Sequence, residues 1–378
     1  RLQAEHAVFG DYCGLEHPLW FAPSAAEATE EVTFRRSNAH AHVAAECHAV
    51  RDAVGMIETS NYGKFEFTGP GAGAWLSQMM TNRLPAIGRM VLTPMLNERG
   101  KLIGDFTICR LAEERFYLIG TWAAEIAYQR WFERYLPPAG VTVRACTMEM
   151  PGLAIAGPNA RALLQELVDE DLSNAAFPFL AFRQLDIGMI PALVGRVSFT
   201  GELGYEIWVT PDYHRRLFDV LVAAGAKHGL RHFGGRALNA MRLEKSFGNW
   251  AREFRPIYGP FEAGLDRFVA LDKGDFVGRE AALAEKSTGG ALRLLAFGVE
   301  TDTDAIGDEP IWHEGAVVGW VTSGGYGHRV GRSLALGYVP AALAGATGGF
   351  EIEIIGERRA AERLAAAPYD PKGARMRS

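Results

Sequence analysis

The sequence predicts an α+β protein that ends in a small all-β domain. Its 378 residues, 48% of them hydrophobic, are enough for two or three globular domains. Over the first three-quarters, segments with strand alternation follow segments with helical periodicity. From about Leu292, the chain instead carries short apolar runs separated by turn residues, without a long helical segment. Short strands at that spacing are typical of a barrel or a sandwich.

The first elements include a glycine-rich turn that invites a nucleotide-binding interpretation. A helical pattern over 41–56 is followed by a strand at 64–68 and then by GPGAGAWLSQMM. Gly69, Gly71 and Gly73 match the G-x-G-x-x-[GA] pattern of dinucleotide-binding turns. That pattern requires an acidic residue about 20 positions later to bind a ribose. The sequence there is IGRMVLTPM, which contains no acid.

A second copy of this segment also argues against a dinucleotide. LAIAGPNARALLQEL at 153–167 repeats the order of strand, Gly-Pro and amphipathic helix, but it lacks the other glycines. The shared feature is therefore a strand-to-helix turn, with Pro70 or Pro158 near the first helical position, where a missing N–H has no cost.

The middle of the chain supplies further elements. A hairpin is predicted at 106–120 around AEE, followed by a helix that Pro137 and Pro138 end. A second helix begins with Thr210 as N-cap and Pro211 at its first position, and it stops at Gly229. GGRALNAMRLEKSFG is predicted to be a helix with its Leu and Met side chains turned inward.

Two acidic residues stand in apolar surroundings. RVSFTGELGYEIWV at 196–209 has the pattern of a hairpin, and in its second arm Glu206 and Trp208 share one face while Tyr205 lies on the other. Asp105 begins the strand-like run DFTIC. Burying a carboxylate is costly unless donors satisfy it. Each acid could cap a turn or pair with an arginine, and Arg236 suits either a carboxylate or an anionic ligand.

Several classes of function receive no support. The net charge of −6 and the lack of a basic tract argue against nucleic acid. No apolar run approaches the ~20 residues of a membrane span, and no signal-peptide pattern is present. We therefore expect neither a nucleic-acid nor a membrane partner, and a cytoplasmic location, or the mitochondrial matrix in a eukaryote. G-x-S-x-G and Walker A motifs are absent, and the glycine-rich segment 321–331 is predicted to be a tight loop.

The cysteines and histidines do not predict a metal site. The four cysteines are widely spaced and form no C-x-x-C pair, which argues against a disulfide framework or a zinc ribbon. His40, His42, Cys47 and His48 are close in sequence, but on a helix they do not converge with the geometry that a metal requires. We expect no bound metal.

Five long motifs resemble the glycine-cleavage T-protein (aminomethyltransferase) family: RVSFTGELGYEIWV, GGRALNAMRLEK, PFEAGLDRFVALDKGDFVGREA, PMLNERGKLIGDFTI and GMIETSNYGKFEFTGPGA. The resemblance runs from about residue 35 to residue 369. It implies three domains in a cloverleaf around a central tetrahydrofolate site, with a β barrel last. The implied divisions are a linker-like segment at 1–34, a folate-binding region of two α+β subdomains at 35–285, and the barrel at 286–378.

The resemblance also implies roles for particular residues. Asp105 corresponds to a catalytic aspartate beside folate N5 and N10, and Glu206 to the residue that holds the pterin. Phe199 occupies the position of a folate-contacting tyrosine and lacks its hydroxyl group. Arg236 matches an arginine near the folate, and Tyr62 falls where many members have Met.

The chemistry of a pterin agrees with these roles. Its pyrimidine edge presents an N3–H and a 2-amino group side by side, and the carboxylate of Glu206 can accept both. Aromatic neighbours, with Tyr62 and Tyr205 as candidates, can stack on the flat ring. Asp105 would orient or deprotonate the folate amine that attacks a one-carbon iminium or formaldehyde.

Two segments indicate a branch of the family. EHAVFGDYCGLEHPLWFAP and KSFGNWAREFRPIYGPFEAGL resemble dimethylglycine and sarcosine dehydrogenases. In those enzymes a flavin domain oxidises an N-methyl group, and the folate-binding part captures the carbon as 5,10-methylene-tetrahydrofolate. The chain begins without Met and lacks a flavin half, so we expect it to be the C-terminal part of such an enzyme or a stand-alone relative. FAD is expected only if an upstream flavin domain exists.

Other interpretations stay open. Asp275 stands where the iron–sulfur-repair relatives carry the Cys of K-G-C-x-x-G-Q, so that branch is not favoured. The chain could instead act alone as a methyl- or aminomethyl-transferase on an amine, a sulfonium compound or a carrier protein. It could also be a non-catalytic folate-binding or scaffold domain.

Overall fold

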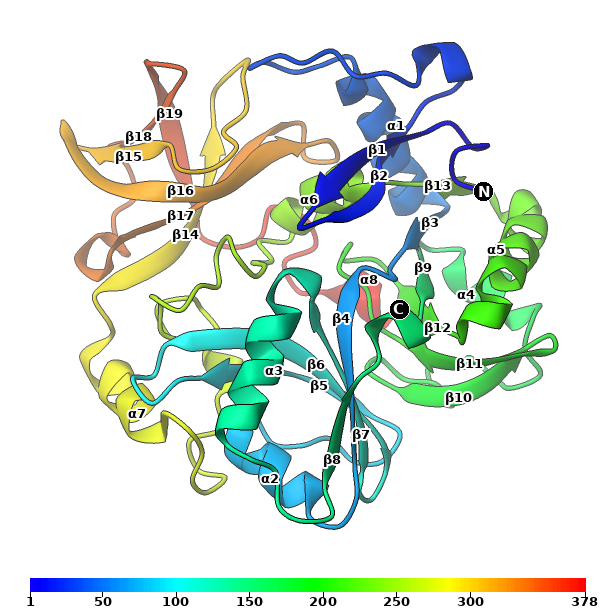
Figure 1. Ribbon diagram of the computed structural model, residues 1–378. Coiled ribbons are helices and arrows are strands. Elements are labelled where there is room, and N and C mark those ends of the chain that lie inside the picture. Colours follow the sequence, from blue (N-terminus) through cyan, green and yellow to red (C-terminus); the bar gives the residue numbers. More distant parts are fainter.

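Two open β sheets and one closed barrel form the framework of the molecule (Figure 1). The computed structural model describes residues 1–378. The six-stranded sheet has the order β10-β11-β12-β9-β3-β13, the five-stranded sheet the order β5-β6-β7-β4-β8, and the barrel closes as β14-β17-β16-β15-β18-β19. The predicted α+β fold with a C-terminal β barrel is therefore confirmed.

The six-stranded sheet packs one face on helices α4 (Ala160–Gln165) and α5 (Pro211–Gly225). Its strands are β3 (Val54–Glu58), β9 (Gly152–Ala156), β10 (Phe182–Ile187), β11 (Ile190–Gly195), β12 (Gly204–Trp208) and β13 (Leu230–His232). Tyr205 and Ile207 point into this core, so strand alternation turns Glu206 and Trp208 to the opposite face. The predicted facing of this strand is confirmed.

The five-stranded sheet is covered on one face by helices α2 (Ala72–Met79) and α3 (Glu125–Arg134). Its strands are β4 (Tyr62–Thr68), β5 (Met90–Leu96), β6 (Leu102–Ala112), β7 (Arg115–Thr121) and β8 (Thr142–Ala145). Phe106 and Ile108 of β6 pack under the helices, so Asp105 and Cys109 lie on the uncovered face. The predicted 106–120 hairpin is confirmed as β6 and β7.

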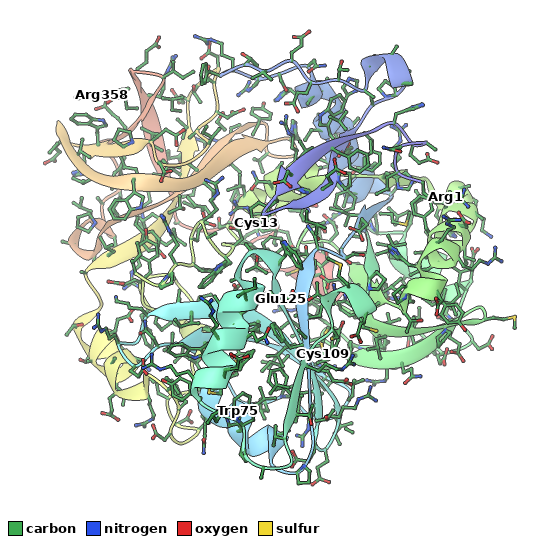
Figure 2. The ribbon with its side chains drawn as sticks, in the orientation of Figure 1. Arg1, Cys13, Trp75, Cys109, Glu125 and Arg358 are labelled. Carbon is green, nitrogen blue, oxygen red and sulfur yellow. The ribbon has the colours of Figure 1, made fainter.

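The uncovered face meets the six-stranded sheet through a shared apolar cluster. The rings of Tyr117 on β7 and Trp208 on β12 lie 6.0 Å apart, and Cys109 belongs to the same cluster. Figure 2 shows Cys109 where the two sheets come together. The faces that carry Asp105 and Glu206 therefore turn toward each other.

Both copies of the repeated segment form a strand, a tight turn and a helix. Gly69 and Gly157 have positive φ, and a Cβ there would lie 1.9 Å from the Gly140 carbonyl oxygen and 2.4 Å from that of Ala53. These glycines therefore allow close backbone approach. Each proline directly precedes the N-cap residue and so lies two positions before the first helical residue, near which it was predicted.

Two segments differ from their predicted secondary structure: one predicted strand is a loop, and one predicted loop is mostly strand. The first arm of the hairpin is β11, and the pairing of Gly195 with Glu206 ends it, so 196–203 is a loop that Arg196 begins. The glycine-rich segment 321–331 is mostly strand, because β16 (Ala316–Gly327) continues through it. A Cβ at Gly324 would lie 2.4 Å from the Ala305 carbonyl oxygen, so glycine lets the barrel wall pass close to its neighbour.

The segment 1–34, predicted to be linker-like, contains a folded hairpin of β1 (Ala7–Tyr12) and β2 (Leu15–Phe21). Trp20 is fully buried between α1 (Ala39–Asp52) and α6 (Gly235–Glu244). The Glu46 carboxylate accepts the backbone N–H groups of Phe21 at 2.6 Å and Gly234 at 2.9 Å. The hairpin therefore packs on α1 and α6, beside the six-stranded sheet.

The boundary predicted at 285/286 falls inside helix α7 (Arg279–Thr288). The barrel strands are β14 (Leu292–Val299), β15 (Pro310–His313), β16, β17 (Arg332–Pro340), β18 (Phe350–Ile354) and β19 (Glu357–Leu364). After the barrel the chain returns to the 196–203 loop beside the six-stranded sheet. There the Tyr369 hydroxyl donates to Glu202 at 2.5 Å, and helix α8 (Ala374–Arg377) follows. None of the helices has both the length and the apolar character needed to cross a membrane.

Candidate functional site

A shallow hollow opens on the face of the six-stranded sheet that carries Glu206. Nine of its thirteen lining residues are hydrophobic. The lining consists of Ile57, Thr59, Tyr62, Ala154, Ile155, Ala156, Val197, Ser198, Phe199, Thr200, Glu206, Phe233 and Leu238. Three residues predicted for the cofactor site, Tyr62, Phe199 and Glu206, thus share one pocket. A small, mostly apolar cleft with few polar groups is typical of a ligand site.

The space above Glu206 arises from its small neighbours in the sheet. Gly195 on β11 and Ala154 on β9 pair with it on either side, and Ile57 on β3 follows Ala154. Paired residues project from the same face of a sheet. Gly195 leaves room for the Met90 sulfur, which a Cβ there would meet at 2.9 Å, and the single methyl of Ala154 leaves the carboxylate at the floor of a shallow trough.

The Glu206 carboxylate accepts no hydrogen bond within the protein, although it is only partly accessible to water. Burial raises the pKa of Glu206 to about 7, and the positive charge of Lys64 opposes that rise. A carboxylate that is desolvated and unpartnered is unfavourable until donors reach it. The side chain is therefore suited to a ligand that brings its own N–H groups.

Two aromatic side chains flank this carboxylate. Burial and, next, the charge of Glu206 raise the pKa of the Tyr62 phenol, which indicates that the two groups are neighbours. Phe199 lies on the 196–203 loop, and its ring stacks on Phe247 with centroids 5.9 Å apart. Arg51 donates to the Thr200 carbonyl oxygen at 2.7 Å and so anchors the loop.

Asp105 lies on β6 of the five-stranded sheet, on the face that is not covered by helices. Burial, with a smaller contribution from the charge of Glu253, raises the pKa of Asp105 to about 7 against a backbone hydrogen bond that lowers it. No side-chain donor satisfies its carboxylate. A carboxyl group that titrates near neutrality can both accept and release a proton at working pH.

The spacing between the two acids follows from strand geometry. Burial and, next, the charge of Glu206 raise the pKa of the Cys109 thiol, so Cys109 lies near Glu206. Asp105 precedes Cys109 by four residues on β6, which is a separation of ~13 Å along an extended strand. The two acids therefore do not form a hydrogen-bonded pair, and Asp105 is not among the residues that line the Glu206 pocket.

Two predicted cofactor residues lie elsewhere. Tyr205 is fully buried in the core behind the sheet, where its ring stacks on Phe177, so its predicted contact with the cofactor is wrong. Arg236 forms an ion pair with Glu30 of the N-terminal segment. Leu238 lines the pocket from the same helix, and two residues of helix rotate a side chain by about 200°, which turns Arg236 away.

Other lining residues were not predicted. Phe233 and Leu238 close the pocket from the segment that enters α6, and Val197 contributes from the loop. Ala154 and Gly195 matter because they are small, and only the strand order places them beside Glu206. No three His, Cys, Asp or Glu side chains are arranged to hold a metal ion.

Two family descriptions account for nearly the whole chain. Residues 1–273 match the GCVT N-terminal domain, and residues 293–370 match the glycine cleavage T-protein C-terminal barrel domain. The chain belongs to the glycine cleavage T-protein family. The predicted resemblance is confirmed, and the C-terminal match coincides with the barrel strands of this family member.

Two mitochondrial dehydrogenases are similar to this chain. Dimethylglycine dehydrogenase of Mus musculus is 37% identical over 357 residues, which cover 92% of this chain and 40% of that protein. Sarcosine dehydrogenase of Homo sapiens is 30% identical over 430 residues, which cover 100% of this chain and 46% of that protein. The chain therefore spans less than half the length of these relatives.

A solved structure of a T-protein has the same fold. The glycine cleavage system aminomethyltransferase T from Bartonella henselae superposes with a TM-score of 0.83 over 97% of this chain and 95% of that chain, at 24% identity. The predicted aminomethyltransferase-type architecture of this T-protein family member is thereby confirmed.

Proposed function

We propose that this chain transfers a one-carbon unit to tetrahydrofolate and forms 5,10-methylene-tetrahydrofolate. The observation that carries the proposal is the Glu206 carboxylate, which has no protein donor and lies in a trough beside two aromatic rings. The family to which the chain belongs is consistent with this substrate.

The residues present fit a reduced pterin. The pyrimidine edge of a pterin offers two adjacent N–H donors, and the two oxygens of Glu206 accept both in a bidentate arrangement. Phe199 and Tyr62 supply flat apolar surfaces against the ring, and Ile57 and Leu238 complete the apolar wall. Such a ligand satisfies the buried carboxylate that the protein leaves without partners.

Asp105 serves as the acid–base group of the proposed reaction. The reduced folate supplies the amine nucleophile when it is bound. Asp105 accepts the proton that this nitrogen loses as the new carbon–nitrogen bond forms, and its pKa of about 7 suits that task.

The carbon donor is proposed to be an N-methylated amine of the dimethylglycine or sarcosine type. The one-carbon unit reaches the folate as the iminium of that amine or as formaldehyde. The relatives that support this are named for those two amines, and this chain spans less than half of them. We further propose that a flavin domain or subunit holding FAD, which is not in this chain, oxidises the amine. A reducing location, cytoplasmic or in the mitochondrial matrix, is part of the proposal.

The proposal is tested by incubating the purified chain with tetrahydrofolate and formaldehyde. We expect 5,10-methylene-tetrahydrofolate to form faster than in the protein-free reaction. Binding of tetrahydrofolate without any acceleration, from formaldehyde or from dimethylglycine with an added flavin partner, would contradict catalysis and favour a binding role. Acceleration with a methylated donor in the absence of any flavin partner would favour a stand-alone transferase.

Replacing Glu206 with Gln is expected to weaken tetrahydrofolate binding by about 30-fold or more. Gln removes the ionised acceptor pair, and losing one partner of a buried charged hydrogen bond costs about 2–5 kcal/mol. Calorimetric titration measures the effect. Glu66→Gln is the control, because Glu66 lies on the same strand as Tyr62 but pairs with Arg115 and Arg144. Equal affinities of Glu206→Gln and the unchanged protein would refute the pterin assignment.

The same substitution is expected to raise the thermal midpoint of the ligand-free protein at pH 8. The pKa of Glu206 is higher in the folded state than in the unfolded chain. The folded state therefore binds more protons between about pH 4.5 and pH 7, and stability falls as the pH rises through that window. Gln has no charge to desolvate. Thermal scans should therefore show a smaller fall in the thermal midpoint between pH 4.5 and pH 8 for Glu206→Gln than for the unchanged protein.

A further inference from the structure

Lys64 is a fully buried lysine next to the candidate site. It lies on β4 two residues after Tyr62, on the same face of the five-stranded sheet. Its ammonium group donates to the carbonyl oxygens of Ser60 at 3.0 Å and Tyr62 at 2.9 Å. No carboxylate lies within salt-bridge distance of Nζ, so its direct partners are neutral.

A buried ammonium with neutral partners is unfavourable unless a negative charge lies nearby. Burial lowers the pKa of Lys64 to about 8, and four groups oppose that fall, namely Glu58, Cys146, Glu206 and Glu125. The group therefore stays protonated at neutral pH. A positive charge is thus held on β4, next to the turn that carries the pocket residue Tyr62.

Among these neighbours, only the Glu206 carboxylate is free to serve a ligand. Glu58 accepts the Ser60 N–H at 2.9 Å, and Glu125 accepts the Thr147 hydroxyl at 2.6 Å. Burial raises the pKa of the Cys146 thiol, which is therefore neutral. Glu58 contributes most to supporting the Lys64 charge, and Glu206 is the supporting carboxylate whose oxygens no protein group occupies.

We infer that Lys64 is a positioning residue of the pterin pocket, which keeps Glu206 ionised through its buried charge and holds the turn that carries Tyr62. The inference rests on the proposed function. Only an ionised carboxylate can accept two N–H groups, since a protonated one turns an O–H toward a donor. Without Lys64, burial would leave Glu206 largely protonated at neutral pH.

The test is the pH profile of tetrahydrofolate affinity in Lys64→Gln. Gln keeps a donor for the Tyr62 turn and removes the charge. Affinity of the unchanged protein should rise with pH around a midpoint near 7, as Glu206 ionises. In Lys64→Gln the midpoint should move up by ~1 pH unit, so that affinity is about eightfold lower at pH 6.5 and nearly equal at pH 9.

Lys273→Gln is the matched control. Lys273 is also a partly buried lysine whose pKa burial lowers to about 8, and it donates to backbone and side-chain oxygens of Ser77, away from the pocket. The pH profile of tetrahydrofolate affinity in Lys273→Gln should coincide with that of the unchanged protein. An unshifted midpoint in Lys64→Gln, or an equal loss of affinity at every pH, would overturn the inference.

A second measurement avoids any substitution at Lys64. Coulomb coupling is reciprocal, so Glu206→Gln should lower the titration midpoint of the Lys64 ammonium, followed by NMR of ¹⁵N-labelled lysine side chains. An unchanged midpoint there would also overturn the inference. These outcomes differ from failure of the proposed function, in which the unchanged protein does not bind tetrahydrofolate at any pH while the Lys64 titration still responds to Glu206.

Discussion

Asp105→Asn is expected to lower turnover by about 10²–10⁴-fold, the range associated with a positioned general base. Asn has nearly the same shape as Asp, so the cleft and the trough beside Glu206 should be preserved. It cannot accept the proton that the attacking nitrogen releases. The affinity for tetrahydrofolate should change far less than turnover, because the pterin edge bonds to Glu206, which lies on another sheet, in a pocket that Asp105 does not line.

The pH profile gives the second measurement for Asp105. Turnover of the unchanged protein should increase as the pH rises through about 7, because the pKa of Asp105 lies there and only the carboxylate is a base. Asp105→Asn should lose this rise. Asp186→Asn is the control, since Asp186 is an exposed aspartate on β10. Unchanged turnover with an unchanged profile would show that Asp105 is not the base.

Loss of activity in Asp105→Asn cannot be attributed to unfolding. Burial raises the pKa of Asp105 above its value in the unfolded chain, so between about pH 4 and pH 7 its ionisation destabilises the fold as the pH rises. A neutral side chain removes that penalty. The thermal midpoint of Asp105→Asn at pH 8 should therefore equal or exceed that of the unchanged protein.

Arg51→Met should be the most destabilising of the changes considered, with a loss of about 3–5 kcal/mol. The Arg51 guanidinium is fully buried and pairs with Glu202 at 2.9 Å and with Glu244 at 2.7 Å. Both carboxylates are at least 98% buried, so removing the cation leaves Glu244 without a positive partner and Glu202 with Arg375 alone. Denaturant unfolding followed by tryptophan fluorescence measures the change.

This ion cluster also joins parts of the molecule that are distant in sequence. Arg51 on α1 holds the 196–203 loop through Thr200, and Glu202 of that loop accepts from Tyr369 and Arg375 of the returning C-terminal segment. Glu244 accepts the backbone N–H of Arg329 between β16 and β17 of the barrel. Arg51→Met should therefore also weaken tetrahydrofolate binding, because the loop carries Phe199.

Two variants control the Arg51 experiment. Arg134→Met removes an exposed arginine paired with Glu98, and such surface pairs contribute under about 1 kcal/mol. Arg51→Met combined with Glu244→Gln removes the buried negative charge that Arg51 alone had paired, and it should recover part of the lost stability. A loss in Arg51→Met no greater than that in Arg134→Met would contradict this account.

The pattern of alternation along one strand was sufficient to place Glu206 correctly. Large apolar residues at every second position can be buried only if they share a face, so Glu206 had to point the other way. The same local logic identified the strand–turn–helix repeat and the barrel strands. It did not predict the 196–203 loop, because the apolar run in RVSFT is also compatible with a strand.

The errors arose where a side chain's partner comes from elsewhere in the chain. Arg236 was a plausible ligand for an anion, but Glu30 of the N-terminal segment pairs with it. Trp20 lies in a segment that reads as a linker, yet it is fully buried between two helices. Neither contact has a signal in the local sequence.

By itself, the sequence determined which elements form and which face of each is apolar, since these depend on residues a few positions apart. Only the tertiary structure decided that Gly195 and Ala154 flank Glu206, and that Lys64 and Asp105 come from the sheet whose uncovered face is turned toward it. Strand order and the packing of sheets set these distances. Charge and desolvation act through space, so the chemistry of each acid depends on neighbours that its own segment does not contain.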